Sequence, residues 1–593
     1  MFKGVKFYSG DELKINGALD DNAKFVSEKQ LKNAERWSKL VEPFITKEDS
    51  DGYWRGEFFG KEMRGASLIY RYTKDEELYG VLTAAAKEMI SAREESGRIS
   101  AYSVEKEFNG WDLWCRKYVL TGLQHYYRIC KDEAFKAEIL EVLKGHADYI
   151  ISKIGDGENQ KSITETSSWW GCVNSCTILE PIVELYKETG EKRYLDFAGY
   201  IISTGGSSDC NFLELALENK LYPYQYPVVK AYETMSFFEG LLAYYEVTGE
   251  EKLFTAVKNF TEAVVKTDMT IIGCSGCTHE LFDNSTVKQT EYSEQIMQET
   301  CVTVTWMRVS ARLFFLTGDV KYIDRIEKSG LNSLYGSLNV NCNDILNLFK
   351  KKYVKGMVFD SYSPLYKNSR GRGTGGYMEF ASGGSCGCCD AIGACGIALM
   401  PLTAVMKCEQ GVIINYLFDG ELKIDDKDGK PVALKFASDY PSGNSCKITV
   451  NCEGEADLTL FVRRPDYCRS VFVDGKDAGK SGYYELSGKF NDGDEIEIEY
   501  ANELKIRKLN GKTAFVYGAI TLAADETKIG EIDFDKPFKI AAPLSYEKLQ
   551  PQKGEFLRFA ISLADGEKLL LTDYQSCGKN WLEKKNRVTV WFD

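Results

Sequence analysis

The chain has 593 residues, of which 44% are hydrophobic and 27% are charged, and its formal net charge is −14. This length exceeds what one hydrophobic core supports and predicts two or three domains. The negative charge argues against nucleic acid or anionic lipid as a partner, because both are bound through basic patches. A membrane span is not expected, since the sequence has no run of about 18 apolar residues.

The first residues of the chain turn polar at Ser9-Gly10-Asp11, before an apolar segment of signal-peptide length has formed. We therefore expect a cytosolic protein. In a reducing compartment the 18 cysteines are expected to be thiols. They would act as metal ligands, nucleophiles or small buried side chains rather than as disulfides.

The first two thirds of the chain repeat a signature in which one helix ends and another begins with acidic residues. The clearest copies contain Gly190, Gly249 and Gly318, each where a helix C-cap favours a left-handed residue. These glycines are 59 and 69 residues apart, which leaves room for two helices and their loops, so the repeat is a helical hairpin. The five copies lie at residues 72–75, 127–132, 186–191, 245–250 and 315–319.

With residues 325–335 and 391–406 available for a sixth hairpin, the repeats predict an (α/α)6 barrel that forms a catalytic domain over residues 1–409. An open solenoid of the same hairpins is the alternative. Closure into a ring accounts better for chemically active residues in the long loops between helices, because a ring gathers those loops at one mouth.

After about Cys408 the pattern changes to short runs rich in β-branched residues, several of them alternating, bounded by turns such as Asp474-Gly475. This pattern is typical of a β-sandwich, which we predict for residues 410–504. Residues 505–593 resume the pattern and form a second sandwich or complete the first.

Two short segments supply potential metal ligands, Glu299-Thr300-Cys301 and Cys388-Cys389. Three sulfurs and one carboxylate suit zinc, which prefers four N, S or O ligands in a tetrahedron. Spacing alone leaves two alternatives open, a reduced thiol cluster and a purely structural zinc site. The structural site would use Cys274, Cys277 and two of the three cysteines Cys386, Cys388 and Cys389.

Further landmarks accompany this motif in chain order: Tyr362-Ser363-Pro364-Leu365, Phe461-Val462-Arg463-Arg464-Pro465, Val473-Asp474-Gly475, Gly493-Asp494 and Val516-Tyr517-Gly518-Ala519. Together they resemble the zinc-dependent cysteine glycosidases whose founding activity is β-L-arabinofuranosidase. The likeness spans nearly the whole chain, and the Glu-x-Cys and Cys-Cys motifs are its specific part.

The resemblance implies that Glu299, Cys301, Cys388 and Cys389 bind zinc and that Cys388 is also the nucleophile. A zinc-bound cysteine is a thiolate at neutral pH, because the cation lowers the pKa of the thiol. Attack on an anomeric carbon would give a thioglycosyl enzyme, which water would hydrolyse with retention of configuration.

Such a reaction also needs a carboxylic acid to protonate the leaving oxygen. Glu280 is the candidate, since it precedes Leu281-Phe282, where the family places an acid before an aromatic residue. It lies 19 residues before Glu299, which is farther than expected, so Glu291 and Glu294 are alternatives.

Candidate sugar-binding residues follow partly from the resemblance and partly from departures from it. Tyr362 resembles a family tyrosine beside the sugar. The chain has only three histidines, so the sugar-binding histidines typical of the family have no obvious counterparts. Aromatic and polar residues occupy the corresponding loops, and aromatic faces suit sugar C–H surfaces. The candidates are Trp111, Trp170 and Asn174, with Asp112, Arg55, Glu57 and Lys61 as further polar residues near the mouth.

We therefore expect a zinc-containing glycoside hydrolase that acts on a small oligosaccharide or glycoconjugate, with a β-L-arabinofuranoside or a related furanoside as substrate. Residues 390–395, after the cysteine pair, depart from the family pattern, so hydrolysis or elimination on another sugar, such as a deoxy sugar or a uronide, is an alternative. A non-catalytic carbohydrate-binding protein with a structural zinc is a second alternative. The acidic surface permits a homodimer.

Overall fold

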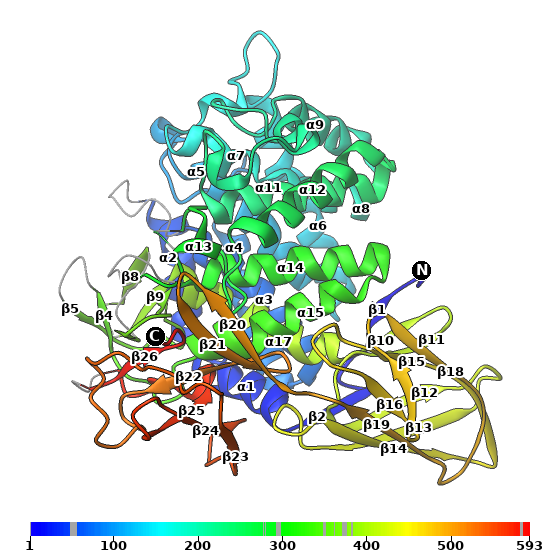
Figure 1. Ribbon diagram of the computed structural model, residues 1–593. Helices are drawn as coiled ribbons and strands as arrows, with labels where there is room; N and C mark the ends of the chain where they lie inside the picture. The colour runs from blue at the N-terminus through cyan, green and yellow to red at the C-terminus, as the bar shows by residue number, and fades with distance from the viewer. Residues whose placement is uncertain are drawn as a thin grey trace.

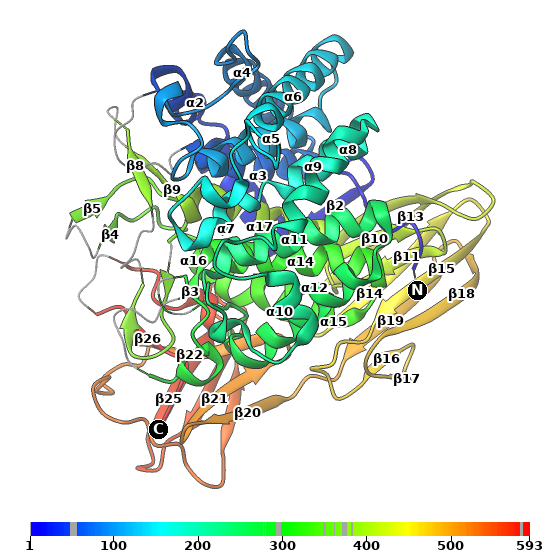
Figure 2. The ribbon, with the colours of Figure 1, turned by 90° about the horizontal axis from the view of Figure 1, so that it is seen from above.

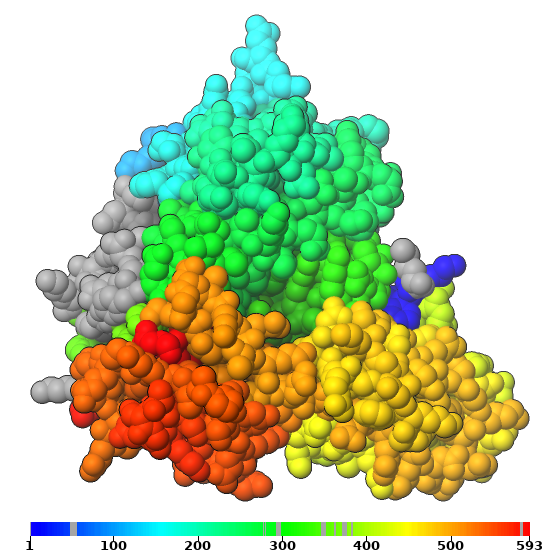
Figure 3. Space-filling view, viewed as in Figure 1, coloured from blue at the N-terminus to red at the C-terminus, as the bar shows by residue number. Residues whose placement is uncertain are grey.

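The computed structural model describes residues 2–47, 56–276, 278, 280–291, 298–347, 352–360, 362–370, 376–380, 384–581 and 585–593, and of residues 346, 347 and 362 it describes the backbone alone. A helical domain makes up the upper part of the molecule in Figure 1, and two β-rich units lie along its base. The space-filling view shows these units side by side beneath the helices, one yellow and one orange to red (Figure 3).

The core of the helical domain, within the described residues, is a ring of six inner helices (Figure 2). Each inner helix contacts the next along the chain, and the last, α17 (Cys388–Ala404), closes the ring against the first, α3 (Glu57–Thr73). The predicted closed barrel is therefore confirmed, and an open solenoid is excluded. The inner helices are α3 (Glu57–Thr73), α5 (Asp112–Tyr127), α8 (Leu179–Thr189), α11 (Ala231–Thr248), α14 (Thr300–Thr317) and α17 (Cys388–Ala404).

Each of the first five inner helices is followed by an outer helix that packs against it. No helix in the part of the chain that the structure describes is long and apolar enough to cross a lipid bilayer. The outer helices are α4 (Glu76–Ser91), α6 (Glu133–Lys153), α9 (Lys192–Ser203), α12 (Glu251–Thr267) and α15 (Val320–Ser329).

The sixth hairpin differs from its prediction. α17 accounts for residues 391–404, and residues 405 and 406 begin β10 (Val405–Cys408). Residues 325–335 lie in α15, in η7 (Gly330–Leu334) and at the first residue of α16 (Tyr335–Ser337), so they continue the fifth hairpin. The N-terminal helix α1 (Ala18–Val26) packs against α17 instead, and α2 (Ala34–Thr46) packs against α3 and α4. The start of the chain thus helps to complete the barrel.

The hairpin turns have the geometry that their glycines predict. Gly190, Gly249 and Gly318 follow α8, α11 and α14 with φ values of 70°, 70° and 67°. A side chain with a Cβ is disfavoured in this left-handed region, and glycine is not. Asp319 then caps α15, because its carboxylate accepts a hydrogen bond from the Lys321 amide.

Two sheets make up the unit that follows the barrel. Alternation along β19 (Glu495–Tyr500) is regular, with Ile496, Ile498 and Tyr500 buried and the glutamates between them exposed. The short strands β1 (Lys6–Phe7) and β2 (Leu13–Asn16), from the start of the chain, join one sheet each. The first sheet has the order β1, β10 (Val405–Cys408), β11 (Gly411–Ile414), β15 (Glu455–Arg463), β18 (Tyr483–Asn491). The second has the order β17 (Lys476–Gly479), β16 (Val471–Val473), β19 (Glu495–Tyr500), β14 (Ser445–Cys452), β13 (Pro431–Ser438), β12 (Asp419–Asp425), β2.

A separate sheet forms the C-terminal unit and contacts the barrel. Its strand β26 (Arg587–Thr589) pairs with β7 (Asn368–Ser369), which comes from the segment between α16 and α17. The Lys579 amine donates hydrogen bonds to the carbonyl groups of Tyr335, Gly336 and Leu338. The domain limits at residues 409 and 504 stay a prediction. The sheet order is β20 (Leu504–Leu509), β21 (Lys512–Tyr517), β22 (Ile520–Asp525), β25 (Lys568–Asp573), β24 (Arg558–Ser562), β23 (Tyr546–Leu549).

Candidate active site

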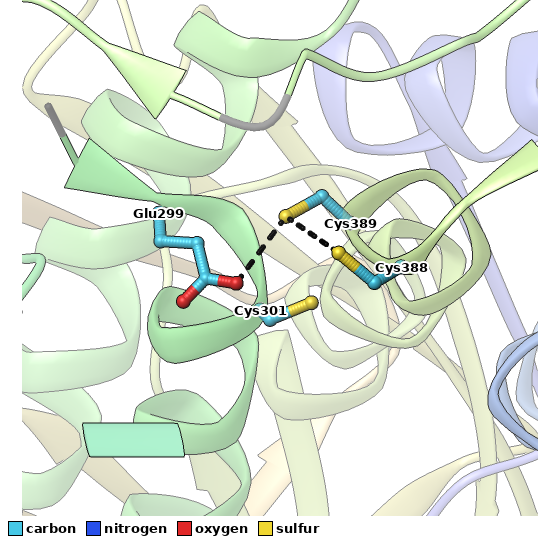
Figure 4. Close-up of side chains that lie close together, drawn as sticks. All are labelled: Glu299, Cys301, Cys388 and Cys389. Carbon is cyan, nitrogen blue, oxygen red and sulfur yellow. Dashed lines mark hydrogen bonds between the residues drawn. The ribbon is translucent and has the colours of Figure 1, made fainter. Parts of the chain in front are cut away.

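The four residues predicted to bind a metal meet at one end of the barrel (Figure 4). Glu299 ends the short strand β3 (Gln298–Glu299), and Cys301 lies in the first turn of α14. Cys388 and Cys389 begin α17. One ligand atom from each residue lies within 4.8 Å of the others, and all four residues are buried. The fold thus brings together two segments that are almost 90 residues apart in the chain.

The geometry of this cluster suits a zinc ion. Tetrahedral thiolate ligands about 2.3 Å from zinc are about 3.8 Å from one another. The sulfurs of Cys388 and Cys389 are 3.9 Å apart, and the Cys389 sulfur is 3.6 Å from Oε1 of Glu299. The other carboxylate oxygen of Glu299, Oε2, is buried without a hydrogen-bond partner among the described residues. Three sulfurs with one carboxylate are a donor set that zinc accepts.

The electrostatics of the cluster single out Cys388. Its pKa is well below that of an ordinary thiol, first because Cys301 and Cys389 share hydrogen bonds with its sulfur, and also because Lys61 and Lys230 lie nearby. Burial raises the pKa of Glu299 to about 8, and the negative sulfur of Cys388 adds to the shift. A bound cation would favour the ionised forms of both groups.

Short β pairings hold the two ligand segments in place. Glu299 lies opposite Tyr362 of β6 (Tyr362–Ser363) in an antiparallel pair. The strand β9 (Ser385–Gly387), which leads into Cys388, pairs with β8 (Tyr377–Glu379). The amide of Cys388 also donates to the carbonyl of Gly376, at 2.9 Å.

A buried arginine, Arg36 of α2, holds the start of α17 through hydrogen bonds. Its guanidinium donates to both carboxylate oxygens of Glu62, at 2.7 and 2.8 Å, and to Asp390, at 2.6 Å. It also contacts the Ser385 carbonyl at 3.0 Å and the Cys386 sulfur at 3.1 Å. Because Asp390 directly follows Cys389, this network orients the cysteine pair.

The same contacts decide between the alternative cysteine sets among the described residues. The Cys386 sulfur lies between Arg36 and Glu62. The Cys274 sulfur donates to the backbone carbonyls of Ser275 and Glu299. Neither sulfur belongs to the four-residue cluster. Cys277 lies outside the described residues.

A cavity of about 180 Å³ opens beside Cys388. Drug-sized ligands occupy pockets of about 300 Å³ or more, so this volume suits a single sugar ring. Half of the described lining residues lie in the first turns of the inner helices. The described lining residues are Glu57, Lys61, Trp111, Trp114, Lys230, Tyr232, Glu233, Glu280, Glu299, Cys301, Gly376 and Cys388.

Glu280, the predicted acid, lines this cavity. Its backbone is left-handed, with φ of 67°, and its carbonyl accepts a hydrogen bond from the Ala231 amide at 2.8 Å. Its carboxylate pairs with the Lys230 amine. The alternative Glu291 is exposed and does not line the cavity, and Glu294 lies outside the described residues.

A second carboxyl group in the cavity, that of Glu57, is held by its neighbours on two sides. Lys61 donates to it at 3.0 Å, and the indole N–H of Trp114 donates to its other oxygen. Burial raises the pKa of Glu57 to about 7, although Lys61 opposes the shift. The sequence marked Glu57 and Lys61 as polar residues near the mouth, and both lie in the cavity; Arg55 lies outside the described residues.

The predicted sugar-binding residues have different surroundings. Trp111 lines the cavity. The ring of Trp170 is partly buried and lies 5.8 Å from the Lys230 amine, outside the cavity lining. Asn174 is fully buried, and its amide donates to the Gly110 carbonyl, next to Trp111. For Tyr362 the structure describes the backbone, which faces Glu299 across β3 and β6.

Asp112 does not have a carboxylate available for a sugar. Its oxygens accept hydrogen bonds from the Ser100 hydroxyl, the Phe108 amide and the Arg116 guanidinium. It therefore stabilises the loop before α5 rather than the cavity.

The sequence did not single out five described residues of the cavity, which are Trp114, Lys230, Tyr232, Glu233 and Gly376. Trp114, Tyr232 and Glu233 lie in the first turns of α5 and α11, and Lys230 immediately precedes α11. The signal was available in principle, because aligning the hairpins places the start of every inner helix at the same mouth.

Comparison with known proteins supplies the family. A profile described as the β-L-arabinofuranosidase GH127 catalytic domain matches residues 11–398, and that of the GH127 middle domain matches residues 411–502. No curated protein sequence matches the chain.

Solved structures share the fold at low sequence identity. The GH127 β-arabinofuranosidase BT3674 superposes with a TM-score of 0.73 and 17% identity, over 100% of this chain and 98% of that one. Ara127N-Se, a GH127 β-L-arabinofuranosidase from Geobacillus stearothermophilus T6, has a TM-score of 0.73 and 17% identity, over 98% and 99% of the two chains. The chain therefore belongs to the GH127 β-L-arabinofuranosidase family and is a glycoside hydrolase.

Proposed function

We propose that this protein is a retaining β-L-arabinofuranosidase with Cys388 as its nucleophile. The observation that carries the proposal is the position of Cys388, which belongs to the buried four-ligand cluster and also lines the sugar-sized cavity. A sulfur placed in this way can contact both a metal and the anomeric carbon of a bound glycoside.

Zinc is the proposed metal, held by Glu299, Cys301, Cys388 and Cys389. When bound, it supplies a positive charge that keeps the Cys388 sulfur ionised at neutral pH. Lys61, whose amine lies 3.9 Å from the Cys301 sulfur, adds a second positive charge to this buried thiolate environment.

The proposed reaction has two displacements at the anomeric carbon. In the first, the Cys388 sulfur forms a C–S bond while the glycosidic C–O bond breaks, and the leaving oxygen takes a proton from a carboxylic acid. In the second, water gives a proton to the resulting carboxylate and displaces the sulfur. Two inversions leave the configuration of the sugar unchanged.

Glu280 is the proposed acid and base. The Lys230 ion pair stabilises its carboxylate form, which is the form that accepts a proton from water in the second step. Glu57 competes for the role, because its pKa near 7 keeps part of its population protonated at neutral pH. Its contacts with Lys61 and Trp114 favour a fixed position in the wall of the cavity, so we assign it to sugar binding.

The remaining assignments come from the sequence. Trp111 would stack on the sugar, and Tyr362, Trp170 and Asn174 would complete the subsite directly or by positioning their neighbours. The substrate would be a small oligosaccharide or glycoconjugate. A reduced thiol cluster needs a reducing compartment, which supports the cytosol as the site of action. A homodimer remains a further proposal.

The test combines metal analysis with a screen of aryl α- and β-pentofuranosides and pyranosides. We expect about one zinc per wild-type chain, less zinc in Glu299→Gln, and hydrolysis of a β-L-arabinofuranoside with retention, read by proton NMR. Cys388→Ser and Glu280→Gln should lose hydrolysis while keeping the fold. Release of the inverted sugar, or full activity in Cys388→Ser, would refute the proposal. Loss of aryl-glycoside hydrolysis in Glu57→Gln but not in Glu280→Gln would transfer the acid role to Glu57.

A further inference from the structure

The proposed mechanism gives no role to one carboxyl group in the cavity, that of Glu233. Glu233, in the first turn of α11, is 2% exposed and lines the cavity. Its Oε1 lies 3.9 Å from the Lys230 amine. Its Oε2 is buried and has no hydrogen-bond partner among the residues that the structure describes.

A buried carboxylate oxygen without a donor is costly, because it has lost its water and gained nothing in exchange. Lys230 does not relieve this cost, since its amine lies 3.9 Å from the other oxygen, Oε1, beyond hydrogen-bond distance, and pairs with Glu280 instead. A ligand that enters the cavity with an O–H group would supply the missing donor.

The opposite side of the ring presents a second polar group. α3 and α11 are three positions apart in the ring of six described inner helices, and α3 contributes the paired Glu57 and Lys61. The Lys61 amine lies 4.5 Å from the centre of the Tyr232 ring, next to Glu233 in the chain. A sugar in the cavity therefore meets charged hydrogen-bonding groups from two facing helices, with Trp111 and Trp114 as apolar walls.

We propose that Glu233 accepts a hydrogen bond from a hydroxyl group of the glycone, and that this contact selects neutral, fully hydroxylated sugars against deoxy sugars and uronides. The inference rests on the proposed function, which it narrows to a class of substrate. A deoxy sugar leaves the Glu233 oxygen without a donor.

A uronide is disfavoured by charge. The described cavity lining contains four carboxyl groups, those of Glu57, Glu233, Glu280 and Glu299, against two lysines. Both lysines already pair with carboxylates, Lys61 with Glu57 and Lys230 with Glu280. A further carboxylate on the sugar would therefore face like charge without a free cation among these residues.

The experiment combines changes in the enzyme with changes in the substrate, as in a double-mutant cycle. The aryl β-L-arabinofuranoside and its 2-, 3- and 5-deoxy analogues are compared in the wild type, Glu233→Gln and Glu233→Ala. In the wild type we expect removal of one hydroxyl to lower kcat/KM by roughly 10- to 100-fold, as for other charged hydrogen bonds. In Glu233→Ala the penalty for that same hydroxyl should shrink to a few-fold, while the other two penalties stay unchanged. Glu233→Gln, which keeps an acceptor oxygen, should preserve most of the preference.

Glu246→Gln is the matched control. Glu246 lies on the same helix but near its other end, where it pairs with Arg312 and Lys187. This variant should keep the wild-type pattern of penalties. If the three penalties in Glu233→Ala equal those of the wild type, or if the wild type prefers a uronide, the inference is wrong.

Failure of the proposed function gives a different result. If the wild type cleaves no arabinofuranoside, the substrate assignment fails. Glu233 is then tested on whichever neutral glycoside the aryl panel identifies. If none is cleaved, calorimetry measures the binding of L-arabinose and its deoxy analogues instead. Loss of hydroxyl discrimination in Glu233→Ala supports the inference in each case, and unchanged discrimination, or binding of none of these sugars, overturns it.

Discussion

Replacing Arg36 with methionine tests whether the network behind the cysteine pair supports both the fold and the metal site. The guanidinium is buried and donates to Glu62 and Asp390, and it also holds the Ser385 carbonyl. Methionine fills similar space but leaves two buried carboxylates without their cation. Breaking a buried pair in this way costs about 3–5 kcal/mol of stability.

The same substitution should also weaken metal binding. Asp390 follows Cys389 in the chain, and its second oxygen accepts hydrogen bonds from the amides of Val358 and Phe359, at 2.6 and 3.1 Å. Loss of a supporting contact of this kind lowers metal affinity by about 10- to 100-fold. We therefore expect Arg36→Met to weaken zinc binding in a chelator competition.

Urea unfolding followed by tryptophan fluorescence measures the stability, because seven of the nine tryptophans lie in residues 1–409. Arg193→Met is the control. Arg193 also pairs with two carboxylates, those of Asp148 and Glu191, but its side chain is 45% exposed. An exposed pair contributes at most about 1 kcal/mol. If Arg36→Met costs no more than Arg193→Met and binds zinc normally, the reasoning about the network is wrong.

Three further predictions concern charge and metal. The pKa of Glu184 is lowered to about 2, because Arg312 and Arg128 outweigh the effect of its burial. At pH values above the pKa of glutamate in the unfolded chain, Glu184 therefore contributes about 3 kcal/mol of folding stability, and this contribution is lost as the pH falls toward 2. Glu184→Gln should be less stable at pH 7 and should lose less stability between pH 5 and pH 2; equal acid sensitivity in both proteins would contradict this. Removing zinc with a chelator should lower the midpoint of thermal unfolding. Free zinc at 100 times its dissociation constant should then restore about 2.7 kcal/mol of folding stability, whereas an unchanged midpoint would show that zinc does not stabilise the folded protein. Because the pKa of Glu57 is about 7, kcat/KM should rise with pH through that value as the carboxylate forms and pairs with Lys61. A Glu57→Gln variant that keeps this rise would refute the assignment of Glu57 to sugar binding.

The sequence was sufficient for the features that depend on local rules. Gly190, Gly249 and Gly318 marked the hairpin turns because a left-handed helix end favours glycine. The two cysteine-containing segments stood out because their residue types are those that zinc prefers. Closure of the barrel was predicted correctly, but the packing of α1 against α17 was not, since a contact between the two ends of a domain leaves no periodic signal.

The parts of the site that were missed depend on three-dimensional neighbours. The Lys230 and Glu280 pair joins residues 50 positions apart, and neither residue type indicates a partner. Glu233 is one acidic residue among many in the sequence, and only its place in the cavity, with one oxygen buried without a donor, distinguishes it. Asp112 was expected near the sugar because it adjoins Trp111, but its hydrogen bonds to Ser100 and Phe108 turn it into a loop anchor.

The most direct test of the account is to identify the residue that carries the sugar during turnover. In Glu280→Gln, an aryl β-L-arabinofuranoside with an activated leaving group needs no acid for the first displacement, whereas the second still lacks its base, so the intermediate should accumulate. Peptide mapping by mass spectrometry should then place one pentosyl group on Cys388. A pentosyl group on Glu57 or another carboxylate, or turnover with inversion and no adduct, would contradict the central claim.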